Sequence, residues 1–94
     1  MVVVWTEYLK HRARLRGFDL ARIEEIVRFS DERYFDTATQ RRVAIGRHGN
    51  KLVMIPYEQE GDPLTPITIH ATTRQQTSLR VRVGDEVWES LGPA

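Results

Sequence analysis

Apolar residues recur every three or four positions in the first third of the chain, the spacing typical of amphipathic helices. A first helix is expected over residues 8–16, because Thr6 is a good N-cap and Gly17 a natural helix end. A second is expected from its cap at Asp19 to near Ser30. Its apolar face consists of Leu20, Ile23, Ile26 and Val27. We therefore predict a tight helical pair.

After the helical pair the apolar pattern changes to the period of two that is typical of β-strands. The predicted strands are residues 33–36, 41–47, 52–57 and 67–70, with a short strand at 2–5 before the helices. His48-Gly49-Asn50 is a typical hairpin turn. The segment 52–57 is almost continuously apolar, which predicts a central strand with Pro56 at its end. The predicted core consists of Leu20, Ile23, Val27, Val43, Ile45, Val53, Ile55, Ile67 and Ile69.

Residues 74–83 fit two patterns. Thr72 or Thr73 can cap a helix here, whereas the alternation over 79–83 also suits an edge strand. We favour the helix. The fold class is then α+β: an N-terminal helical pair packed on a small twisted antiparallel sheet, with a possible C-terminal helix. The 94 residues form one domain, with its core at about 2–84 and an acidic tail at 85–94.

The composition excludes several kinds of site. The chain has no cysteine, so disulfides, zinc–thiolate centres and thiol nucleophiles are ruled out. It has no Gly-rich phosphate loop and its three histidines lack metal-ligand spacing, so we expect no cofactor and no metal. No run approaches the roughly 20 apolar residues of a membrane span, and no signal peptide is present, so a cytoplasmic protein is expected. Because so small a domain is marginally stable, a homodimer is a candidate state.

The net charge is only +1, but the cations are clustered. Two segments, 8–17 and 71–84, contain several arginines and no acidic residue, and only two of the 14 cations are lysines. Arginine's planar fork suits phosphate, although a GC-rich genome also favours arginine. The candidate nucleic-acid contacts are Arg12, Arg16, Arg80 and Arg82. Alternatively, the first two pair with Glu24 or Glu25 of the second helix.

His70 is the leading candidate for chemistry. Metal-independent RNA cleavage needs a group that deprotonates the 2′-hydroxyl, one that protonates the leaving 5′-oxygen, and a cation for the developing charge. His70 suits the proton transfers because histidine titrates near neutrality, and Arg74, four residues on, suits the charge. The alternative is a surface histidine at a strand end, followed by a helix-capping threonine.

Three pieces of the chain together resemble a family of small bacterial proteins related to the BrnT toxins, and through them to RelE-like ribonucleases. These pieces are Trp5–Tyr8 running on to Phe18, the hairpin around Gly46–Asn50, and Ile67–His70 followed by Thr72–Gln75. The resemblance implies a toxin-like scaffold from a toxin–antitoxin system.

One position departs from the family, which usually has a histidine where this chain has Tyr8. A phenol can donate a proton or stack on a base, but with a pKa of about 10 it is a poor base at neutral pH. Two hypotheses follow. The first is a metal-independent endoribonuclease or RNA-binding module in which Tyr8 joins His70 and Arg74. The second is a non-catalytic interaction domain whose arginine face binds an acidic partner, such as a cognate antitoxin.

Overall fold

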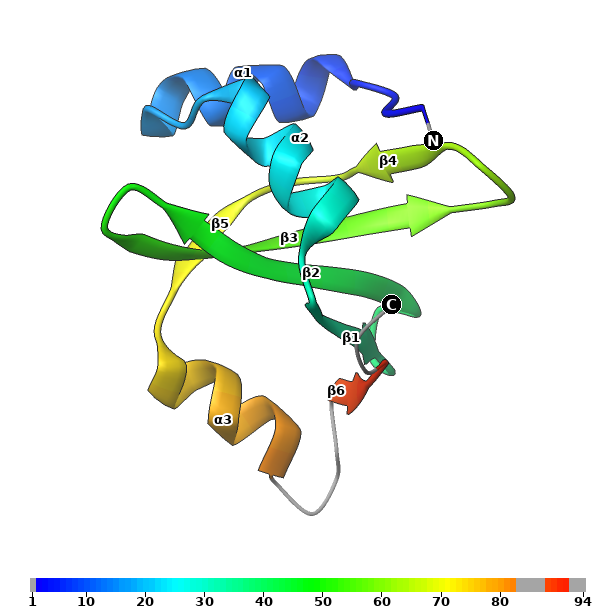
Figure 1. Cartoon of the computed structure of the whole chain (residues 1–94), viewed down its shortest axis with the longest axis vertical. Helices are drawn as coiled ribbons and strands as arrows, with labels where there is room; N and C mark the ends of the chain where they lie inside the picture. Colours follow the sequence, from blue (N-terminus) through cyan, green and yellow to red (C-terminus); the bar gives the residue numbers. More distant parts are fainter. Residues whose placement is uncertain (1, 83–87, 92–94) are drawn as a thin grey trace.

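The computed structural model describes residues 2–82 and 88–91, and it places helices on both faces of one antiparallel sheet (Figure 1). The helices are α1 (Glu7–Arg16), α2 (Leu20–Phe29) and α3 (Arg74–Arg82). The strands are β1 (Glu32–Asp36), β2 (Arg41–His48), β3 (Lys51–Gln59), β4 (Leu64–Pro66), β5 (His70–Thr72) and β6 (Trp88–Ser90). The predicted α+β class, with an N-terminal helical pair packed on an antiparallel sheet, is confirmed.

The ends of the helices follow from local capping. The Thr6 hydroxyl accepts a hydrogen bond from the Leu9 N–H (3.1 Å), and Gly17 ends α1 with a left-handed φ of 73°. The Thr73 hydroxyl accepts from the Gln76 N–H (3.1 Å), which makes Thr73 the cap of α3. Of the two patterns in this last segment, the helix is therefore the one that forms. None of the helices in the described part of the chain is long and apolar enough to cross a membrane.

The strand order is β4-β3-β2-β1-β6, and β5 also pairs with β3. The predicted central strand is confirmed, because β3 has β2 on one side and both β4 and β5 on the other. It runs on to Gln59, so Pro56 lies inside the strand and not at its end as predicted. The predicted strand at residues 2–5 is reduced to a single bridge between Val3 and Leu64.

Pro56 explains why the strand predicted at 67–70 is interrupted. β4 pairs with Tyr57–Gln59 and β5 pairs with Leu52–Met54, so residues 67–69 connect two short strands along one edge of β3. The Ile67 N–H donates to the Pro56 carbonyl (2.8 Å), so the backbone of Pro56 faces this edge. Because proline has no N–H to donate in return, the ladder is broken at that point.

The sheet has one apolar cluster on each face. The cluster beneath α1 and α2 includes Ile23, Val27, Val53, Ile55 and Ile69, all predicted core residues. The cluster on the opposite face contains Val43, Ile45, Leu52 and Trp88. Two predicted core residues, Leu20 and Ile67, are only half-buried. Ile67 falls short because it lies in the connection between β4 and β5 and not in a strand.

The second cluster extends the folded core beyond residue 84. β6 pairs with β1, Trp88 is 1% exposed, and its indole Nε1–H donates to a carboxylate oxygen of Asp36 (3.3 Å). Part of the stretch predicted as an acidic tail is thus a strand with a core side chain. Residues 85–87 and 92–94 of that stretch lie outside the described residues.

Candidate anion-binding and catalytic site

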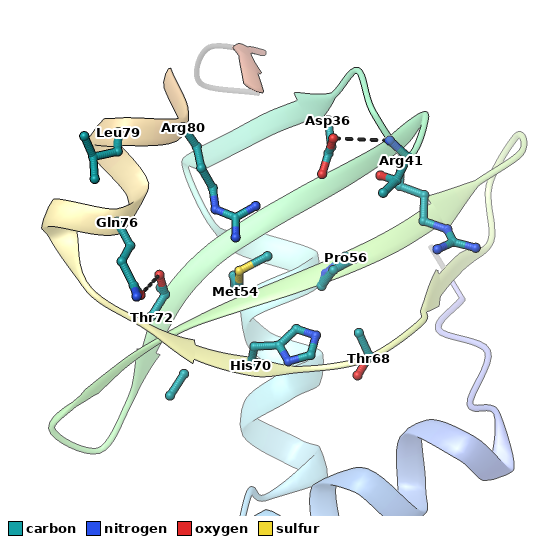
Figure 2. Close-up of a pocket in the computed structure, with 12 residues that line it drawn as sticks. Asp36, Arg41, Met54, Pro56, Thr68, His70, Thr72, Gln76, Leu79 and Arg80 are labelled. Atoms are coloured by element: carbon teal, nitrogen blue, oxygen red, sulfur yellow. Dashed lines mark hydrogen bonds between the residues drawn. The ribbon is translucent and has the colours of Figure 1, made fainter. Parts of the chain in front are cut away.

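A pocket of about 840 Å³ lies between α3 and the sheet face that carries the smaller apolar cluster (Figure 2). Met54 and Pro56 of β3 form part of its lining, and α3 contributes Leu79 and Arg80. His70 lies at the edge where β5 begins. The remaining lining residues are Asp36, Thr39, Arg41, Thr68, Ala71, Thr72 and Gln76. Its size falls within the range of about 300–1,000 Å³ that is usual for small-molecule sites.

His70 connects this pocket to α1. It pairs in register with Met54 and so projects from the same sheet face. Arg16 Nη1 lies 3.3 Å from His70 Nδ1 and donates to the Ile69 carbonyl (3.4 Å). Since a guanidinium has only donors, Nδ1 is the acceptor and the proton of the neutral ring is on Nε2. Two residues 54 positions apart, one from α1 and one from β5, thus meet at one site.

The charges around His70 keep its imidazole neutral. Burial lowers the pKa of His70 below its ordinary value of 6.5, and the positive charges of Arg16, Arg12 and Arg80 lower it further. These cations come from α1 and α3, on either side of the sheet edge. At neutral pH the ring is therefore uncharged and has a lone pair with which to accept a proton.

Two further donors near this edge lack protein partners. Within the described residues, neither Arg12 Nε nor the Thr68 hydroxyl has a hydrogen-bond partner, although both atoms are buried. Thr68 lines the pocket beside His70 (Figure 2). The Arg12 guanidinium lies 5.6 Å from the centroid of the Tyr8 ring, which is itself 56% exposed. Since buried polar groups normally have partners, these two unpaired donors are unusual.

Arg74 does not lie beside His70 but pairs with β1. Its Nη1 is 2.6 and 2.7 Å from the two carboxylate oxygens of Glu32, which also accepts from the Tyr34 hydroxyl (2.7 Å). Burial and this carboxylate raise the pKa of Tyr34 to about 12. The spacing of four residues between His70 and Arg74 is not a helical spacing, because the chain passes from β5 into α3 between them. The arginine that contacts His70 is Arg16.

The other two predicted arginines, Arg80 and Arg82, lie on α3. Arg80 lines the pocket, with its guanidinium carbon 5.1 Å from the centroid of the Trp88 ring. Arg82 belongs to α3, but its side chain lies outside the described residues. The carboxylates proposed as alternative partners of Arg12 and Arg16 are bound within α2. Glu24 accepts from Arg28 (2.9 Å), and Glu25 lies 3.8 Å from Arg22.

His48, outside the pocket, has a structural role that the sequence did not indicate. Its Nε2 accepts a hydrogen bond from the Asp19 N–H (2.8 Å), and its ring packs edge-on against Phe18, with the centroids 5.1 Å apart. These contacts fix the β2–β3 hairpin to the start of α2. Over residues 2–82 and 88–91, no three His, Asp or Glu side chains are grouped so that they could hold a metal ion.

No family model, curated protein or solved structure matches the chain. The chemistry that the site can perform therefore follows from its own geometry. The positive charges of Arg12 and Arg16 lie near His70 at the edge of β5, and burial and these charges lower the pKa of its imidazole. The adjoining pocket has room for a group attached to an anion bound there.

Proposed function

We propose that this protein binds RNA through its phosphates and cleaves it at His70 without a metal ion. The observation that carries the proposal is the contact between Arg16 Nη1 and His70 Nδ1, at 3.3 Å, on the border of the pocket. It joins a phosphate-binding cation to a group that is neutral at pH 7.

In the proposed reaction, the scissile phosphate draws the Arg16 guanidinium onto its oxygens, as a charge-assisted pair. This releases His70 Nδ1, which takes the proton of the 2′-hydroxyl. The 2′-oxygen forms a bond to phosphorus and the bond from phosphorus to the 5′-oxygen breaks, giving a 2′,3′-cyclic phosphate and a 5′-hydroxyl. Arg12 and Arg16 stabilise the charge on the phosphorane-like transition state.

The leaving 5′-oxygen needs a proton, and we assign Tyr8 as the candidate donor. It lies one helical turn before Arg12 on α1, and the Arg12 guanidinium lies against its ring. Its phenol can act as an acid where the histidine of BrnT-related proteins is missing. Arg74, which holds Glu32, then contributes to the site only by anchoring α3 to the sheet.

The resemblance to BrnT and RelE-like proteins extends this proposal to a toxin of a bacterial toxin–antitoxin pair. Support comes from the acid-free segment 8–17, of which Arg12 and Arg16 lie close to His70. A toxin of this kind would arrest growth when expressed alone. Growth arrest by the wild type but not by a His70→Ala variant is the expected result in a sensitive bacterial host.

The direct test is cleavage of several RNAs by purified protein in the presence of EDTA. His70→Ala should reduce the rate by about 10²- to 10⁴-fold, the usual contribution of a positioned acid–base group. Arg16→Ala should weaken RNA binding as well as cleavage. Arg14→Ala is the matched control, because Arg14 lies on the exposed side of the same helix. Equal cleavage by wild type and His70→Ala would refute the catalytic assignment.

One observation favours a second function, a non-catalytic interaction domain. On α1, Leu15 is 70% exposed and Tyr8 56% exposed, and helical spacings of three and four residues place both beside Arg12. An arginine face with exposed apolar groups suits an acidic protein partner such as an antitoxin. If the wild type cleaves no RNA, tight binding to such a partner that Arg16→Ala weakens would support this function instead.

A further inference from the structure

The pocket has features that phosphate binding does not require. Met54, Pro56 and Leu79 give it an apolar part, whereas a phosphate needs only donors and positive charge. Polar groups lie around this apolar part, among them Thr68, Gln76 and Arg80. A mostly apolar recess with a few well-placed polar groups is typical of a site for a flat organic ligand.

Arg80 provides a planar surface in this recess. Its side chain extends from α3 toward the face of the sheet (Figure 2), and its guanidinium carbon is 5.1 Å from the centroid of the buried Trp88 ring. In the described part of the chain it makes no hydrogen bond or ion pair, so its orientation rests on the indole. A planar cation held in this way is a surface on which a nucleobase can stack.

A polar group is available for the edge of such a base. The Gln76 carbonyl oxygen accepts from the Thr72 hydroxyl (3.3 Å), which leaves the amide N–H₂ of Gln76, an exposed residue that lines the pocket, as a donor. The recess thus combines a stacking surface with a donor at its rim.

We infer that the pocket under α3 holds an unpaired nucleobase of the RNA, stacked on Arg80, next to the phosphate bound by Arg12 and Arg16. The inference rests on the proposed function and names its substrate class, single-stranded RNA. A base within a duplex is stacked and paired, and the deep, narrow major groove of A-form RNA keeps it away from such a pocket.

The test measures equilibrium binding, by fluorescence anisotropy, to three 12-nucleotide probes. These are a single-stranded RNA of mixed sequence, the same strand annealed to its complement, and an abasic ribose-phosphate strand of equal length. To prevent cleavage during the measurement, His70→Ala is the parent protein, and every further variant is made in that background. The single strand should bind about 5- to 100-fold more tightly than the abasic strand, the usual contribution of stacking one base.

Arg80→Lys separates stacking from charge, because lysine keeps the positive charge and loses the plane. It should weaken binding of the single strand by about 5- to 100-fold and leave binding of the abasic strand unchanged. Arg42→Lys, at an exposed position on β2 outside the pocket, is the matched control and should change neither. Thermal unfolding of each variant checks that α3 remains folded.

The outcomes distinguish a failure of the nucleobase site from a failure of the proposed RNA binding on which it rests. If the protein binds none of the three probes, RNA binding itself is wrong. If it binds all three equally, or if Arg80→Lys has no effect on the single strand, RNA binding stands and the nucleobase site is refuted. Preference for the single strand that Arg80→Lys abolishes, and Arg42→Lys does not, supports the site.

Discussion

The two faces of the sheet differ in how closely the helices approach them. On the face of the helical pair, α2 packs so tightly on β2 that a Cβ atom at Gly46 would lie 2.7 Å from two side-chain atoms of Ile26. On the other face, α3 leaves a pocket of about 840 Å³ beside the sheet. Since successive residues of a strand point to opposite faces, the same strands serve both a tight core and a possible ligand site.

The composition of the helices explains this difference. α2 buries Ile23, Ile26 and Val27. Among the described side chains of α3, Thr77 alone is buried, Val81 is partly buried, and Leu79 is 57% exposed. α3 therefore cannot close its face of the sheet.

Arginines on the two faces of the sheet also have different partners. On the helical-pair face, Arg33 donates to the Val27 carbonyl (2.7 Å) and to the Tyr57 hydroxyl (3.0 Å), so it closes the end of α2. On the pocket face, Arg80 rests on Trp88. A comparable cation thus serves the fold on one face and is available to a ligand on the other.

The largest expected effect that separates the faces is on stability. Ile23→Ala should lower the free energy of unfolding by about 2–5 kcal/mol, because it leaves a cavity in a fully buried cluster. Leu79→Ala should change it by about 0.5 kcal/mol or less, because most of that side chain is in solvent. Urea unfolding of both variants measures the difference. Equal losses would mean that α3 is as firmly packed as α2.

A smaller effect is expected at Gly46. Gly46→Ala should destabilise the protein by about 1–3 kcal/mol, the usual cost of overpacking, because the added methyl must displace the Ile26 side chain. The double variant Gly46→Ala, Ile26→Ala removes the Cγ atoms that would clash and should cost less than the sum of the two single changes. Additive losses in urea unfolding would show that α2 shifts as a whole instead.

Much of the fold could be predicted because its signals are local. Thr6, Gly17 and Asp19 set the helix ends through contacts within a few residues, and the almost continuous apolar run at 52–57 identified β3 as a central strand. The break at residues 67–69 was missed because it depends on which side of β3 the missing N–H of Pro56 faces. That depends on strand pairing, which no local pattern gives.

The candidate site was predicted less well, because it is built from distant segments. His70 and Arg16 were both named, but nothing in the spacing of the sequence pairs residues 54 positions apart. Arg74 was chosen for its nearness in sequence, and the start of α3 carries it to Glu32. Trp88 was missed because β6 has only three residues, of which Glu89 and Ser90 are polar, and so short a strand gives too weak a pattern.

The smallest expected effect tests the electrostatics of the pocket face through the titration of His70. Arg16→Ala should raise the pKa of His70 toward 6.5, because it removes the nearest positive charge, whereas burial, Arg12 and Arg80 still hold it down. The His70 Cε1–H resonance, followed by NMR against pH, measures the shift, and Arg14→Ala should leave it unchanged.

The same titration affects stability. Because the pKa of His70 is lower in the folded protein, the unfolded chain takes up the proton first as the pH falls. The contribution to stability is therefore complete above pH 6.5 and is lost as the pH falls through the folded pKa. In Arg16→Ala this loss should be smaller, since the two pKa values lie closer together. An unchanged titration in Arg16→Ala would mean that the guanidinium does not rest on Nδ1 in solution, and would remove the observation on which the proposed function rests.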